Sequence, residues 1–435
     1  MINSASNQLL FSSRKNFLSK DSILVGVQKE VQALFRHLFH MLQRFFSNVW
    51  SQTGDIGRIQ LATKVAKSEN ASRKIDSQIY VGPGMQIEPK PGADPTVHRF
   101  MNYLLRGDQF PFQWLNGATL KAIFVRKDPF FLRSMKEEFQ YVFEQAAKRL
   151  PLIGSKEEML FETFIGNCIA LLPYSYPEAG EVFSIPQKIE GEWRICQYRV
   201  DPIELTPKGI LTPLKAFGLT SPNAPPLLTF LGTTYPAGDG FLASILSDFT
   251  PGLSVGHAPY LLGKTKIDSW LRGKTEVRLY GLSLGGALCF QVLRHHREKI
   301  EQANVYNPPG LFPWNWDKPF DREKVNIFCQ ENDLVSTMGF FPEGRGVSVY
   351  RVFGSRVENW FNAHVKCYTG TGQVSIAKSS VAVENNRTIR KILTLAHLIF
   401  GLVLGLLSIY CFTLLYLLAR KIIVELTQYK SIAPF

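Results

Sequence analysis

One serine of this chain stands in a pattern that suits nucleophilic chemistry. Gly281, Ser283 and Gly285 form a GxSxG between a predicted strand at 276–280 and a predicted helix at 284–296. At such a strand-to-helix turn the hydroxyl projects from the sheet edge, because flanking glycines let strand and helix approach without Cβ clashes. The pattern predicts that Ser283 is a nucleophile, and the alternative is a glycine-rich turn with an idle serine.

A serine nucleophile needs a base, and the base needs a group that orients it. In the α/β-hydrolase arrangement that a strand–serine–helix turn indicates, the chain order is serine, acid, histidine. Of the eight histidines, only His364 and His397 lie far enough beyond Ser283 to leave room for an acid. His397 falls within a long apolar run, so elimination selects His364 as the base.

The orienting acid is expected between Ser283 and His364, at the carboxyl end of a strand. Asp333 follows a predicted strand at 324–329 through a short loop. Three other carboxylates compete, namely Asp317, Asp321 and Glu331. The first two precede the strand, and Glu331 stands two residues before the Asp-Leu-Val turn. Asp333 is the predicted acid, and its alternative role is that of a turn or helix-capping residue.

An ester-cleaving serine also needs hydrogen-bond donors for the oxyanion. The backbone N–H of Leu284, directly after the nucleophile, is one expected donor. The second should come from the end of an earlier strand, and the sequence LLTFLGT places Thr233 there. Thr233 can offer both its N–H and its hydroxyl.

Five motifs between about 227 and 369 resemble those of the class 3 lipases, which include fungal triacylglycerol lipases. LTFLGT resembles the strand of that family that ends in FRGT, and VGHAPYLLGKTKIDSW resembles its VHxGF helix entry. YGLSLGGAL resembles its GHSLGGAL elbow, VYNPPGL the strand that follows, and NDLVS the NDPVP acid turn. The resemblance implies a triad of Ser283, Asp333 and His364, oxyanion donors at Thr233 and Leu284, and no metal or organic cofactor.

The chain also departs from the family pattern. Leu231 replaces an arginine, and Leu282 replaces the histidine before the nucleophile. His257 corresponds to a structural histidine of the helix entry. Residues 236–259 stand where a lid could cover the site; the alternative is an ordinary packed helix.

The elements that must position these residues are predicted to form an α/β sheet with covering helices. Extended patterns occur at 182–185, 193–200, 227–231, 276–280, 302–306, 324–329 and 347–353. Helical patterns occur at 98–105, 129–150, 156–172, 240–249, 262–272 and 284–296. The sequence thus predicts an α/β-hydrolase-type domain at 81–380, with a helical first part at 81–220 and a catalytic part at 221–380.

The C-terminal region, 381–435, contains 28 residues without a charged side chain, at 392–419. About 20 apolar residues span a bilayer, so this run predicts one transmembrane helix, and a buried core helix is the alternative. Arg387, Arg390 and Lys391 flank its start and are expected to face lipid head groups. Gly401 and Gly405 form a GxxxG through which two copies could pair as a homodimer.

The N-terminal region, 1–80, is basic and contains an amphipathic pattern at 27–49 followed by a polar linker. Its apolar face is expected to lie in a membrane interface or to pack on the globular part. The first residues lack the charged-then-apolar run and cleavage site of a secretory signal.

Charge is concentrated at the two ends of the chain. Residues 1–80 hold 11 basic and 5 acidic side chains, and residues 381–435 hold 6 and 2. The nearly balanced middle argues against a nucleic-acid partner, and the basic ends suit a membrane. The sequence predicts a single-pass membrane protein that hydrolyses lipid esters, and the alternative is an inactive lipase-like membrane scaffold.

Overall fold

The computed structural model describes most of the chain from residue 78 onward. The chain divides into two units, Met1–Lys74 and Ile75–Phe435, and every described residue belongs to the second. The described residues are 78–106, 128–207, 213–233, 253–316, 318–354, 360–370 and 372–430, together with Ser244, Ser247, Asp248 and Thr250. The predicted amphipathic helix and most of the predicted lid lie outside them.

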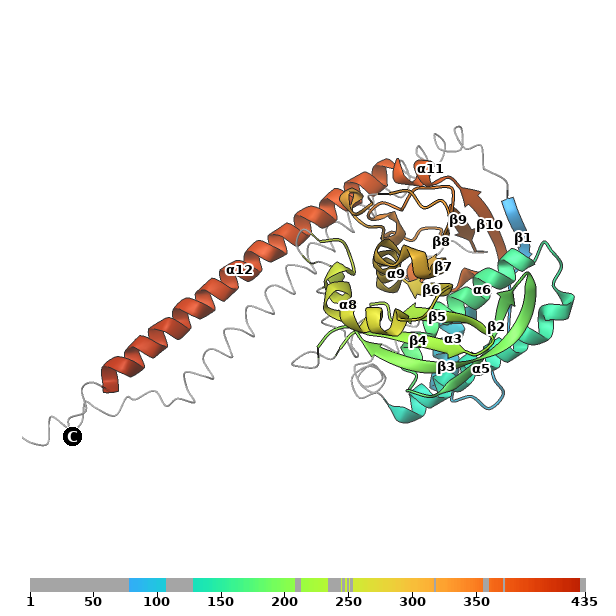
Figure 1. Cartoon of the computed structure of the whole chain (residues 1–435), viewed down its shortest axis with the longest axis horizontal. Coiled ribbons are helices and arrows are strands. Elements are labelled where there is room, and N and C mark those ends of the chain that lie inside the picture. Colours follow the sequence, from blue (N-terminus) through green and yellow to red (C-terminus); the bar gives the residue numbers. More distant parts are fainter. Residues whose placement is uncertain are drawn as a thin grey trace, which may run out of the picture. The chain divides into compact units, whose positions relative to one another are not determined.

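A ten-stranded mixed sheet runs through the described unit in the order β1-β10-β9-β8-β7-β6-β5-β4-β3-β2 (Figure 1). The strands are β1 (Gln78–Pro83), β2 (Val182–Ile189), β3 (Glu192–Glu204), β4 (Lys215–Ser221), β5 (Ala224–Phe230), β6 (Val277–Leu282), β7 (Ile300–Tyr306), β8 (Lys324–Gln330), β9 (Val347–Phe353) and β10 (Gln373–Ser379). Strands β5 to β9 are parallel, and the strands on either side of them pair antiparallel. The α/β sheet predicted from the sequence is therefore a mixed sheet.

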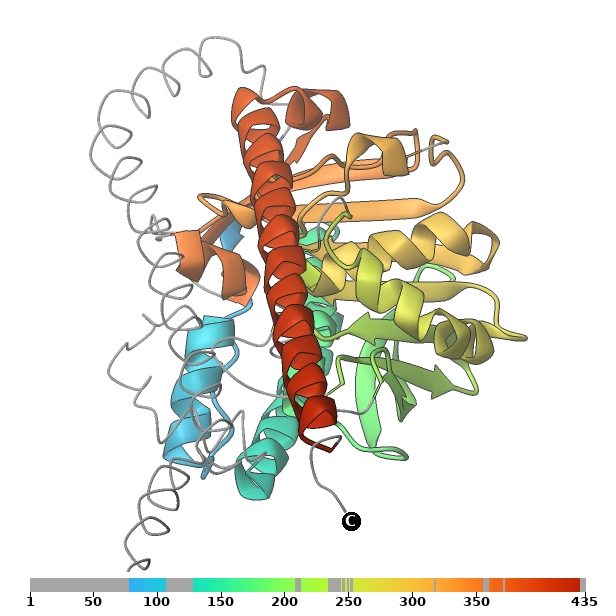
Figure 2. The same ribbon diagram turned by 90° about the vertical axis from the view of Figure 1, so that its left-hand side faces the viewer.

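Helices cover both faces of this sheet. They are α3 (Pro95–Arg106), α5 (Pro129–Arg149), α6 (Glu158–Leu171), α8 (His257–Leu271), α9 (Leu284–His295), α10 (Trp360–Val365), α11 (Val381–Asn385) and α12 (Thr388–Lys430). The yellow α8 and α9 lie on one face, and α3, α5 and α6 lie on the other (Figures 1 and 2). Every residue of β6 is buried, because helices exclude water from both sides of a central parallel strand.

The central strand is held at close range by small residues on both faces. Gly166 of α6 lies against the Tyr306 and Tyr280 rings, where a Cβ atom would fall 2.0 Å from the Tyr306 hydroxyl. On the opposite face, a Cβ at Gly285 of α9 would fall 2.5 Å from the carbonyl oxygen of Phe230. The small residues let both helices approach the sheet closely, and this fixes where α9 begins.

The structure contains three strands that the sequence analysis did not predict. The sequence does not predict β1, β4 or β10, whose apolar alternation is short and is interrupted by Gly, Pro or Ser. Strand β1 falls partly within the predicted linker and pairs with β10 at one edge of the sheet. With β2, β3 and β4, the region 81–220 contributes strands as well as helices.

The apolar C-terminal run forms α12, which is 43 residues long and includes all of 392–419. By length and composition its segment Thr388–Leu406, with a mean hydropathy of 1.8, is sufficient to cross a membrane. The helix starts against the sheet domain and then extends away from it (Figures 1 and 2). Within its first turns Arg390 and Thr394 are buried, whereas Ile392 and Leu395 are exposed.

Candidate active site

The predicted nucleophile lies at a sharp turn between β6 and α9. Ser283 has φ 57° and ψ −126°, a conformation that costs a non-glycine residue about 1–3 kcal/mol. The glycines on either side are required, because a Cβ at Gly281 would fall 2.3 Å from the backbone of Gly285. The turn places Ser283 at the carboxyl ends of the parallel strands and at the start of α9, where the Ser283 carbonyl accepts hydrogen bonds from the N–H groups of Gly286 and Ala287.

The structure brings the three predicted catalytic side chains into one hydrogen-bonded series. The Ser283 hydroxyl donates to Nε2 of His364 over 2.7 Å, and Nδ1 of His364 donates to Oδ1 of Asp333 over 2.9 Å. These proton positions follow from the carboxylate, which can only accept at Nδ1 and so leaves Nε2 as an acceptor. All three side chains are at least nine-tenths buried.

The carboxylate of Asp333 is fixed by the turn that follows it. Val335 N–H donates to Oδ1 over 2.9 Å, and Ser336 N–H donates to Oδ2 over 3.1 Å, at the start of the short helix η9 (Val335–Thr337). Asp333 therefore caps η9 and also contacts His364. The turn-residue role considered for Asp333 and its predicted role as the orienting acid are compatible, because the same carboxylate accepts hydrogen bonds from the turn and from His364.

Two buried amides hold the backbone around His364, and sequence reasoning did not find them. Asn307 Nδ2 donates to the carbonyls of Ala363 and His364 over 3.1 and 2.8 Å. Gln330 Nε2 donates to the carbonyls of Ala363 and Lys366, and Gln330 N–H donates to Asn307 Oδ1 over 2.8 Å. Both amides lie at the carboxyl ends of buried parallel strands, and this position in the sequence could have identified them as residues near the site.

The expected oxyanion donors follow β6 and β5, and a Cβ at Gly232, next to Thr233, would fall 2.9 Å from the carbonyl oxygen of Leu282. Leu284 is the first residue of α9, and Thr233 lies three residues beyond β5. The Thr233 hydroxyl donates to Oδ2 of Asp248 over 2.9 Å. Asp248 is half-buried in the region of the predicted lid and was not singled out from the sequence. Burial raises its pKa to about 7, and the Thr233 hydrogen bond and nearby His364 partly oppose that rise.

The competing candidates lie elsewhere. Nδ1 of His257 is 3.3 Å from Oε1 of Gln291, and Nε2 of His397 donates to the backbone carbonyl of Asp248 over 2.6 Å. Asp321 accepts a hydrogen bond from the backbone N–H of Arg345. Asp317 is outside the described residues. Among the candidate acids, hydrogen bonding to His364 was found for Asp333.

The two departures from the family pattern are core residues. Leu231 is fully buried, and Leu282 is 3% exposed at the end of β6. Each leucine fills space beside the serine turn with apolar atoms. Among the described residues no group of three or more His, Cys, Asp or Glu side chains is arranged to hold a metal ion.

Comparisons with known proteins give a distant structural likeness. No protein-family model matches the chain, and no curated protein is significantly similar to it in sequence. A triacylglycerol lipase from Penicillium expansum aligns at 13% identity and TM-score 0.34, over 53% of this chain and 89% of the lipase. The Lip2 lipase from Yarrowia lipolytica aligns at 12% identity and TM-score 0.29, over 52% of this chain and 86% of that lipase.

Proposed function

We propose that this chain is a membrane-associated serine hydrolase that cleaves carboxylic ester bonds of lipids, either acylglycerols or phospholipids. The observation that carries the proposal is the buried hydrogen-bonded series from Ser283 through His364 to Asp333. A serine of ordinary acidity becomes nucleophilic when a neutral imidazole can take its proton as the new bond forms. The strained turn at Ser283 supports the same role.

The reaction follows from the positions of these groups. Ser283 Oγ attacks the ester carbonyl carbon while its proton passes to Nε2 of His364. The oxyanion accepts hydrogen bonds from the N–H groups of Thr233 and Leu284. His364 then gives the proton to the departing alcohol oxygen, which leaves an acyl-serine. A water molecule releases the acid by the same two steps, and Asp333 stabilises the imidazolium each time it forms.

The lipid substrate class is inferred from α12. This apolar helix contacts a segment beside the site, because His397 donates to the carbonyl of Asp248, whose side chain binds Thr233. The helix can cross a membrane by length and composition. A site attached in this way to a bilayer-spanning helix would encounter esters that reside in the same bilayer.

An active-site-directed fluorophosphonate probe tests the proposal. We expect the detergent-solubilised, full-length protein to be labelled, and Ser283→Ala to remove both the label and the hydrolysis of acylglycerol or phospholipid in mixed micelles. Near-ultraviolet circular dichroism would show that both proteins are folded. If folded wild-type protein takes no label and hydrolyses no lipid ester, the inactive scaffold replaces this proposal.

A further inference from the structure

The start of α12 carries a buried cation that an anchor would not need. Arg390 is 0% exposed, and its guanidinium lies 4.1 Å from the centre of the Phe341 ring. Among the described residues no carboxylate lies within ion-pair distance of it. Burying a charge without a counter-ion is costly, and an apolar residue would pack here at lower cost. The sequence led us to expect Arg390 at the lipid head groups, and the structure corrects this.

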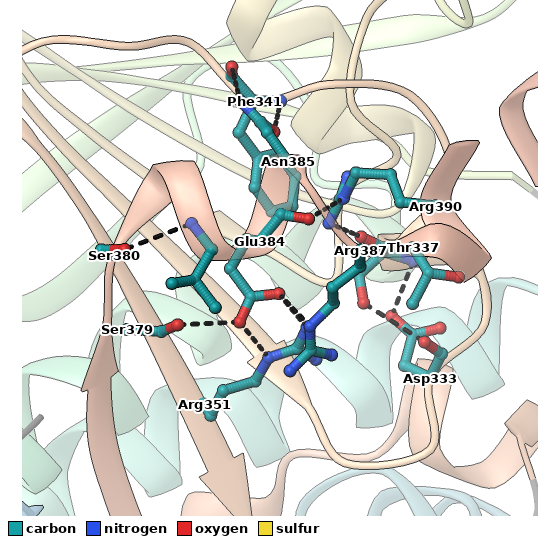
Figure 3. Close-up of polar contacts among 12 residues, drawn as sticks. Asp333, Thr337, Phe341, Arg351, Ser379, Ser380, Glu384, Asn385, Arg387 and Arg390 are labelled. Carbon is teal, nitrogen blue, oxygen red and sulfur yellow. Dashed lines mark hydrogen bonds and ion pairs between the residues drawn. The ribbon is translucent and has the colours of Figure 1, made fainter. Parts of the chain in front are cut away.

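Backbone carbonyls accept hydrogen bonds from all three nitrogens of the guanidinium instead. Nη2 donates to Ser336 O over 2.7 Å, Nη1 donates to Gly339 O over 2.7 Å, and Nε donates to Glu384 O over 2.9 Å. Figure 3 shows Arg390 between the end of α11 and the turn that carries Asp333 and Thr337. The planar fork of arginine can join several carbonyls at once, which an ammonium group on a flexible stem does less well.

This turn is the one that fixes the acid. Ser336 offers its carbonyl to Arg390 and donates its N–H to Oδ2 of Asp333, and its hydroxyl donates to Asp333 O over 3.3 Å. Arg390 is thus separated from the carboxylate by one residue. A shift of Ser336 would carry its N–H away from the carboxylate and would release Asp333 from the geometry that meets His364.

A second residue of α12 contacts the same turn. One helical turn after Arg390, Thr394 Oγ1 accepts a hydrogen bond from Gly339 N–H over 2.8 Å and donates to Arg390 O over 2.6 Å. Gly339 has φ 69°, and a Cβ there would fall 2.1 Å from the carbonyl oxygen of Gly310. The turn is therefore held between Gly310 on one side and α12 on the other.

We propose that Arg390 is a positioning residue for Asp333, and that the first two turns of α12 belong to the framework of the active site. The proposal rests on the proposed function, since it assigns a role in that reaction. Asp333 touches His364, and Arg390 acts only through Ser336. Thr394 supports the same turn and should contribute less, because it makes one hydrogen bond to the turn where Arg390 makes three, to Ser336 O, Met338 O and Gly339 O.

The chain supplies a matched control three residues away. Arg387 Nε lies 3.2 Å from Oε2 of Glu384, an ion pair to which Arg351 also contributes. Burial alone would raise the pKa of Glu384, and the two arginines lower it to about 2. Replacement of Arg387 by methionine removes a cation from the same junction and leaves the side chains of Arg390 and Thr394, which bind residues 336–339, in place.

Four full-length variants in detergent micelles test the proposal: Arg390→Met, Arg390→Lys, Thr394→Val and Arg387→Met. A water-soluble short-chain ester is the substrate, so that membrane binding does not enter the rate. We expect Arg390→Met to lower kcat about 10²-fold, as for a misplacement of about 1 Å, with KM unchanged. Arg390→Lys should recover part of kcat, Thr394→Val should lose less than Arg390→Met, and Arg387→Met should match wild type.

Hydrogen–deuterium exchange of the peptide that spans 333–340 supplies a readout that needs no turnover. The N–H groups of Val335, Ser336 and Gly339 should exchange faster in Arg390→Met and should be unchanged in Arg387→Met. If Arg390→Met does not fold, the other three variants test the proposal. Arg390→Lys and Thr394→Val should then show a lower kcat and faster exchange than Arg387→Met. Equal behaviour of Arg390→Met and Arg387→Met, or of Arg390→Lys and Arg390→Met, overturns the proposal. An inactive wild type refutes the proposed function, and the exchange data then decide alone whether α12 holds the turn.

Discussion

The proposed base side and the proposed oxyanion side of Ser283 are held in different ways. On the base side, Asn307 and Gln330 donate to carbonyls on both sides of His364, and they bind each other. On the oxyanion side, the described contact of the Thr233 side chain is one hydrogen bond to Asp248. The loop of the proposed base therefore has redundant support, whereas the contact described for the Thr233 hydroxyl is with a carboxyl group that can change its charge.

The largest expected effect comes from removal of the base itself. His364→Ala should lower kcat by roughly 10⁴- to 10⁶-fold, because Ser283 then has no proton acceptor. His257→Ala should leave the rate near that of wild type and lower only stability, since His257 contacts Gln291. Ester hydrolysis and thermal unfolding of both variants check this, and the reverse pattern would show that the base is misassigned.

A smaller effect is expected on the oxyanion side. Thr233→Val keeps the side-chain shape and the backbone N–H but removes the hydroxyl that binds Asp248. Without this bond the loop should no longer aim its N–H at the oxyanion, and kcat should fall about 10²-fold. Steady-state kinetics measure this. If Thr233→Val loses less kcat than Asn307→Ala, the oxyanion side is the better supported of the two sides.

The base loop should tolerate the loss of one amide better. Asn307→Ala removes two donors, but Gln330 still donates to Ala363 and Lys366. We expect kcat to fall about tenfold or less, with a loss of about 1–3 kcal/mol in the free energy of unfolding from the carbonyls left unpaired. Kinetics and chemical denaturation of the same preparation separate the two effects.

The smallest expected effect is one of pH on stability. The pKa of Asp248 rises from 3.8 to about 7 on folding, so between these values the native state holds a proton that the unfolded chain releases. The contribution of this group to stability is therefore full below pH 4 and is lost as pH rises through 7. Asp248→Asn should flatten this dependence. Apparent Tm values of both proteins from pH 5 to pH 8 measure it, and parallel curves would contradict the assignment.

The sequence predicts those features that depend on local pattern and chain order. Ser283 and Asp333 each follow a strongly apolar strand, and His364 is selected by order, so the three could be named before their contacts were known. Asp248 and Arg390 could not be found in this way. Each is identified by a contact between segments far apart in sequence, and a cation beside an apolar run ordinarily indicates a membrane flank.

The sheet edges illustrate the same limit. Strands β6 to β8 are mostly buried, and the apolar residues grouped in each of them make them recognisable without reference to a partner strand. Strand β1 is recognised only by its partner β10, which lies almost 300 residues later in the chain. Its sequence, of which only Tyr80 is buried, could not be distinguished from a polar linker without that partner.

The junction between β10 and α12 also determines where the chain can be cut. A soluble fragment that ends near residue 380, where the hydrolase domain was expected to end, would lack Asn385, Arg390 and Thr394. It would lose the paired amide contact of Asn385 with Phe341 and the hydrogen bonds of Arg390 and Thr394 to residues 336–339. For the proposed membrane-associated hydrolase, proteolytic cleavage at this point would therefore end activity at the same time as it released the domain.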